Sequence, residues 1–79
     1  MDRKELVEKL IEFASRAYGK DASEITEATN ITEELGVKSM QRVALSASIE
    51  NEFDVLIPVA RIGNYETIGD LADFILDEM

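Results

Sequence analysis

The chain has 79 residues and a formal net charge of −9, and it contains neither Cys nor His. This length predicts one domain over residues 1–79, with a core only just large enough to fold alone. The composition excludes disulfides, a thiolate nucleophile and the commonest metal ligand and general base. The negative charge disfavours nucleic acids and anionic membranes as partners.

The N-terminal segment predicts an amphipathic helix that ends near residue 18. Asp2 and Glu5 have the spacing of a capping box, and Gly19 is placed to end the helix. Its apolar residues recur at steps of three and four: Leu6, Val7, Leu10, Ile11, Phe13, Ala14 and Ala17. No long apolar run is present here, so we expect neither a signal peptide nor membrane insertion, and a cytoplasmic location.

Residues 20–38 predict a long connection with little regular structure. Asp21 and Glu24 have the spacing that opens one short turn. A connection of this length between helices is unusual unless it is functional or needed by the topology. Three apolar residues are expected to anchor it to the rest of the protein: Ile25, Ile31 and Leu35.

A second helix is predicted over residues 39–53, with Ser39 as its N-cap. The preceding residues lack helical periodicity, whereas the following apolar residues recur at helical spacing. A serine that opens a helix is most often only a cap. One face of the helix holds Leu45, Ile49 and Phe53, and a nearly opposite face holds Met40, Val43, Ala44 and Ala47. This pattern fits a central helix buried on both sides, or one whose Met40 face is exposed to partners.

The remainder predicts an extended segment, one short helical turn and a final helix. Pro58 pushes Ile57 out of helical geometry and suits the start of a turn over residues 59–62. Thr67 and Asp70 form a capping box for the last helix, whose inward residues are expected to be Ile68, Leu71, Ala72, Phe74, Ile75 and Met79. The predicted fold is all-α: a small four-helix bundle of three main helices and one short third helix.

Several short motifs occur in a fixed order along nearly the whole chain. They are Leu35-Gly36-x-x-Ser39-Met40, Ile49-Glu50-x-x-Phe53, Ile57-Pro58 and Thr67-Ile68-Gly69-Asp70-Leu71. In this order and spacing they closely resemble the acyl carrier protein family. The chain departs from that family at Lys38, where Asp is usual, and mildly at Met40, where Leu is usual.

The resemblance implies a carrier that partner enzymes act on, and not an enzyme. A 4′-phosphopantetheine arm on Ser39 would supply the thiol that the chain lacks. The implied partners are a phosphopantetheinyl transferase, an acyl- or aminoacyl-loading ligase, and synthase or transferase enzymes. In this family a cleft beside the second helix shelters the acyl chain, and Val43, Ala47 and Ile62 are candidates for its mouth. Ordinary packing of these residues is an equally open alternative.

The cargo and the modification remain open at this point. The chain could be a discrete acyl carrier of fatty acid, lipid or polyketide-type biosynthesis. Ile49-Glu50-Asn51-x-Phe53-Asp54 and Pro58-Val59 also resemble carriers of activated amino acids, of the D-alanyl or peptidyl type. An unmodified interaction module is a further alternative. Hydrolysis by Ser39 is disfavoured, because only carboxylates or Lys38 could act as its base.

The charges are distributed unevenly along the chain. Residues 19–36 and residues 67–79 each carry a net charge of −4. Residues 37–48 contain only two charged residues, Lys38 and Arg42. The family commonly presents an acidic second helix and short third helix to basic partners. We therefore expect a specialised pathway with less basic or more apolar partner surfaces, unless both charges are merely solvated. The candidate recognition residues of this expected monomer are Lys38, Met40, Arg42, Val43, Ala47, Arg61 and Ile62.

Overall fold

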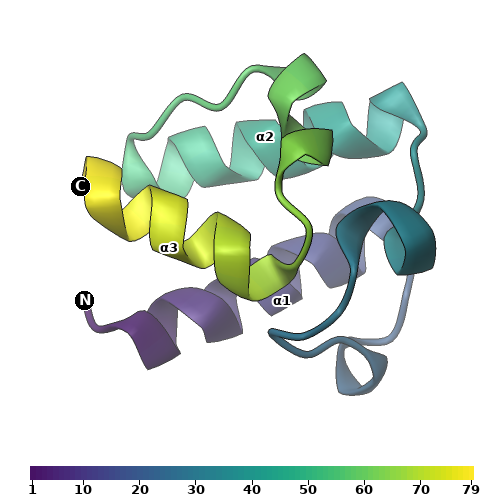
Figure 1. The fold of residues 1–79 in the computed structure, drawn as a ribbon, viewed down its shortest axis with the longest axis horizontal. Helices are drawn as coiled ribbons and strands as arrows, with labels where there is room; N and C mark the ends of the chain where they lie inside the picture. The colour runs from purple at the N-terminus through teal and green to yellow at the C-terminus, as the bar shows by residue number, and fades with distance from the viewer.

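The computed structural model describes all 79 residues, and helices form nearly all of its regular structure. The three long helices are α1 (Arg3–Tyr18), α2 (Ser39–Phe53) and α3 (Ile68–Glu78). The short ones are the 3₁₀ turns η1 (Ala22–Glu24) and η3 (Val59–Asn64), and the π-helical turn η2 (Ile31–Leu35) (Figure 1). The predicted all-α bundle of three main helices and a short third helix is confirmed, and η2 is an addition to it.

Local signals define the ends of α1. The Asp2 carboxylate accepts a hydrogen bond of 2.8 Å from the backbone N–H of Glu5. Gly19 ends the helix in the left-handed region, with φ of 68°, and its N–H donates to the carbonyl of Ser15. Both ends therefore lie where the sequence places them.

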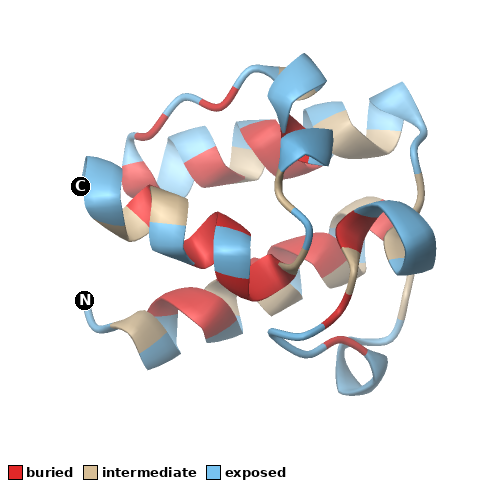
Figure 2. Ribbon diagram, viewed as in Figure 1, coloured by how far each residue is buried: buried red, intermediate tan, exposed pale blue.

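The core lies between α1 and the rest of the bundle. Helix α1 packs against both α2 and α3, and η3 packs against α2. Figure 2 shows the buried faces of these helices turned toward one another. The largest fully buried side chains are Leu6, Leu10, Ile31, Leu45, Ile49, Ile57, Ile62, Ile68, Leu71 and Ile75. Tyr18 is also buried, although the apolar pattern of α1 did not include it.

The connection between α1 and α2 is held by its apolar residues and by backbone pairing. Ile25 and Ile31 are buried and Leu35 is partly buried, as predicted. The N–H of Ile31 donates to the carbonyl of Glu66 at 2.9 Å, and the N–H of Gly69 donates to that of Glu27 at 2.8 Å. These bonds fix the connection against the start of α3.

Helix α3 begins with the predicted capping box. The Thr67 hydroxyl accepts from the N–H of Asp70 at 3.1 Å, and the Asp70 carboxylate accepts from the N–H of Thr67 at 3.3 Å. Ile68, Leu71, Ala72 and Ile75 are buried, and Phe74 packs against the core. The prediction that Met79 faces inward is wrong, because its side chain is exposed at the helix end.

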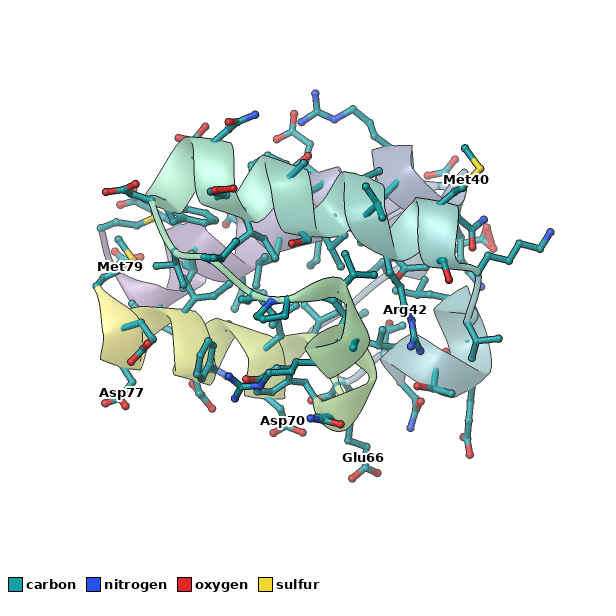
Figure 3. All side chains as sticks on the ribbon, turned by 90° about the horizontal axis from the view of Figure 1, so that it is seen from above. Met40, Arg42, Glu66, Asp70, Asp77 and Met79 are labelled. Atoms are coloured by element: carbon teal, nitrogen blue, oxygen red, sulfur yellow. The ribbon has the colours of Figure 1, made fainter.

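The two chain ends lie on one side of the bundle, and the start of α2 lies on the other (Figures 1 and 3). An ion pair of 2.8 Å between Lys9 and Glu52 joins α1 to the last turn of α2. No helix combines the length and the apolar character that crossing a membrane requires.

Candidate functional site at the start of α2

Ser39 is the first helical residue of α2, and its side chain is exposed. The predicted N-cap at Ser39 is therefore wrong by one position. Lys38 has the extended backbone of the cap, with φ of −69° and ψ of 128°. Its carbonyl accepts the first helical bond, from the N–H of Arg42 at 3.1 Å. Because no side chain caps α2, the Ser39 hydroxyl has no capping role.

The first turn of α2 has the electrostatics of an anion site. The N–H groups of a first helical turn have no partner within the helix, and the helix dipole places partial positive charge there. This turn contains no acidic residue, and Lys38 is exposed beside it. A phosphodiester on Ser39 would therefore be stabilised. The residues present thus fit a 4′-phosphopantetheine group.

Gly36 turns the chain from η2 into this site. Its φ of 121° lies in a region that residues with a side chain rarely adopt. Its N–H donates to the carbonyl of Ile31 at 3.0 Å and closes η2. The structure explains why Leu35 and Gly36 precede the site. Leu35 packs on the core, and Gly36 makes the turn that presents Ser39.

The two apolar faces of α2 have different environments. Leu45 and Ile49 are fully buried and Phe53 is nearly so. On the other face Met40 is 85% exposed and Val43 is 50% exposed, and both Ala44 and Ala47 are exposed. Burial on both sides is therefore ruled out. In Figure 3 Met40 projects away from the bundle, so this face is accessible from outside.

Arg42 is held by neighbouring segments instead of being a solvated charge. Its Nη2 donates to Thr32 Oγ1 at 3.3 Å. Its Nη1 is so close to Gly63 that a Cβ at that position would lie 2.9 Å away. Burial raises the pKa of the nearby Tyr18 hydroxyl, and the charge of Arg42 partly opposes that rise. The guanidinium thus links α2 to η2 and η3, which no local sequence pattern could indicate.

The residues expected around an acyl cleft do not form one in this structure. Ile62 is fully buried in the core, so for this residue the packing alternative holds. Val43 and Ala47 lie on the exposed face and line no cavity. The structure has one pocket, and no hydrophobic residue lines it. Arg61 is exposed on η3, with its guanidinium 5.6 Å from the ring centre of Phe74.

Together these features define a class of protein: a small helical bundle that presents a free serine at the positive end of a central helix. Such a serine suits the attachment of an anionic group. Residues 8–75 match the family model described as "phosphopantetheine attachment site". The chain belongs to this family.

Curated relatives cover nearly the whole chain. An acyl carrier protein of Saccharopolyspora erythraea is 31% identical over 98% of this chain and 81% of its own length. One from Thermotoga maritima is 32% identical over 92% of this chain and 90% of its own. The match confirms the predicted resemblance and the predicted prosthetic group, 4′-phosphopantetheine. It also confirms the prediction of a carrier and not an enzyme.

Proposed function

We propose that the chain is a discrete carrier protein that holds acyl intermediates as thioesters on a 4′-phosphopantetheine arm attached to Ser39. One observation carries the assignment to this residue. Ser39 is exposed in the uncapped first turn of α2, within the segment that the family model matches. Its hydroxyl is therefore available to a modifying enzyme.

The arm supplies a thiol when bound, and the chain has none of its own. The residues of the protein would hold the phosphodiester through the first-turn N–H groups of α2 and the helix dipole. Tethering raises the local concentration of a bound intermediate at each enzyme that the carrier meets. The bond-making chemistry then belongs to those enzymes.

The partners that this function requires are a phosphopantetheinyl transferase, a loading ligase, and synthase or transferase enzymes. We propose that they contact the exposed face of α2 formed by Met40, Val43, Ala44 and Ala47, together with Lys38. This face carries no acidic residue, which favours partner surfaces that are apolar and not strongly basic. A specialised pathway, a cytoplasmic location and a monomeric single domain over residues 1–79 complete the proposal.

Intact-mass analysis tests the attachment site. The protein is incubated with coenzyme A and a broad-specificity transferase, and one phosphopantetheine should be added. The Ser39→Ala variant should gain no phosphopantetheine. The Ser48→Ala variant, a matched change on the same helix, should be modified like the wild type. Because the Ser39 side chain caps nothing, Ser39→Ala should change the free energy of unfolding by less than about 0.5 kcal/mol.

Two outcomes would contradict the proposal. Modification of Ser39→Ala would place the arm elsewhere. Refusal of the folded wild type by every transferase tried would favour the unmodified interaction module. Circular dichroism of each variant separates a loss of modification from a loss of folding.

A further inference from the structure

The pocket of this structure lies between η2 and η3 and has a volume of about 340 Å³. Six residues line it, and none is hydrophobic: Asn30, Thr32, Glu33, Gly63, Asn64 and Glu66. A hydrocarbon chain would gain little here, because there is no apolar surface to bury it against. The lining instead offers carboxylates, amides and a hydroxyl, so the pocket suits a polar ligand.

Arg42 approaches this pocket from the side of α2. Its guanidinium contacts Thr32 and lies against Gly63, which both line the pocket. In Figure 3 the Arg42 side chain points from α2 toward the space between η2 and η3. The Arg42 guanidinium therefore brings positive charge to the α2 side of the pocket. The N–H groups of this guanidinium are hydrogen-bond donors at that side of the pocket.

Glu33 and Glu66 give the pocket its negative charge. Both are exposed, and the ion pairs of the protein involve other carboxylates. In Figure 3 Glu66 projects outward near η3. Because both carboxylates are among the lining residues of the pocket, a cation would be favoured beside them. The structure has no group of three or more acidic, His or Cys side chains suited to a metal ion.

The pocket is within reach of the proposed attachment site. Arg42 follows Ser39 by three residues, a rise of about 4.5 Å along a helix. The length of one arginine side chain then spans the distance from α2 to Thr32. A phosphopantetheine arm is longer than an arginine side chain. An arm on Ser39 could therefore place its far end in this pocket.

We infer that the pocket receives the far end of the arm when its cargo is an aminoacyl group. The cargo ammonium would lie against Glu33 and Glu66, and carbonyl oxygens of the arm would accept from Arg42. The inference rests on the proposed attachment at Ser39 and deepens it by naming a cargo class. An acyl group without an amino function lacks the charge that these carboxylates attract.

Two loaded forms that differ by one amino group test the inference. A broad-specificity transferase attaches stable amide analogues of D-alanyl- or propionyl-pantetheine to ¹⁵N-labelled protein, and intact mass verifies the loading. The backbone amide signals of Thr32, Gly63 and Asn64 should differ between the two forms by several times more than signals of α1 and α3. The difference should shrink with added salt.

The double variant Glu33→Gln/Glu66→Gln should abolish the difference between the two loaded forms. Glu8→Gln/Glu78→Gln is the matched control, because both of its positions are exposed and outside the pocket. This control should retain the full difference. Circular dichroism checks that both double variants are folded.

Four results would overturn the inference. Identical pocket signals in the two loaded forms would do so, as would a difference that survives Glu33→Gln/Glu66→Gln. Saturable shifts of the same amides by sub-millimolar Mg²⁺ in the unmodified protein would assign the pocket to a metal ion. Failure to load either analogue, seen by mass before any spectrum, would overturn the proposed function as well.

Discussion

At the scale of single residues, mutations can test the close contact between the Arg42 guanidinium and Gly63. A Cβ at position 63 would lie 2.9 Å from Arg42 Nη1. This distance is shorter than Cβ atoms normally keep from atoms to which they are not bonded. Only the far end of a flexible side chain has to move, so we expect Gly63→Ala to cost about 0.5–1.5 kcal/mol, the worth of the Arg42–Thr32 hydrogen bond. In an Arg42→Ala background the same change should be neutral or slightly stabilising.

Urea unfolding of the wild type, the two single variants and the double variant measures this coupling. Strictly additive effects would show that the guanidinium is not confined by Gly63. Ala60→Gly is a control within η3, because it alters an exposed residue of the same short helix. Its effect should be the same with or without the arginine.

At the scale of elements, α2 has a structural face and an exposed face. Phe53 is buried, and its ring centre lies 5.9 Å from that of Phe13. Phe53→Ala should therefore destabilise the protein by about 3–5 kcal/mol, a large part of the stability of a domain this small. Met40→Ala should cost less than about 0.5 kcal/mol, because that side chain is 85% exposed. Thermal unfolding compares them, and similar losses would contradict the exposure of the Met40 face.

The long helices were predictable because their signals are local. Asp2 and Gly19 bound α1, and the Thr67–Asp70 pair opens α3, as their spacing in the sequence indicates. The η2 turn was missed because backbone bonds to the segment before α3 help to hold it, and such pairing leaves no local periodicity. Its local signal is a pair of capping side chains: Asn30 accepts from the N–H of Glu33, and Glu34 accepts from the N–H of Asn30.

The site was predictable in part. Serine is a preferred N-cap, yet the extended backbone of Lys38 moves the cap back one position and leaves Ser39 free. The environment of Arg42 depends on Thr32 and Gly63, which are distant in sequence. The polar pocket was missed for the same reason, since its residues come from two separate segments.

At the scale of the whole molecule, Lys38 is the exposed cation beside Ser39 in a chain of net charge −9. Lys38→Asp should speed the acylation of the modified protein by enzymes with basic docking surfaces. It should slow transfer by the partners of this protein, because electrostatic steering acts mainly on association. Lys4→Asp, an exposed change on α1, is the control and should have a smaller effect on both.

Rates measured over a range of salt concentrations decide this prediction. The effect of Lys38→Asp should fall as added salt shortens the screening length. Rates that are unchanged at every salt concentration would exclude Lys38 from partner recognition. Arg42 is left intact here, because its loss would also disturb the contacts to η2 and η3.

Both chain ends lie across the bundle from the start of α2 (Figure 1). A surface-coupling tag at either end would therefore leave Ser39 directed away from the support. Protein immobilised in this way should be modified in place, and its partners could be recovered on the same chip. A tag inserted between η2 and α2 would instead block the serine. The two ends of the chain are therefore the positions to use for immobilisation.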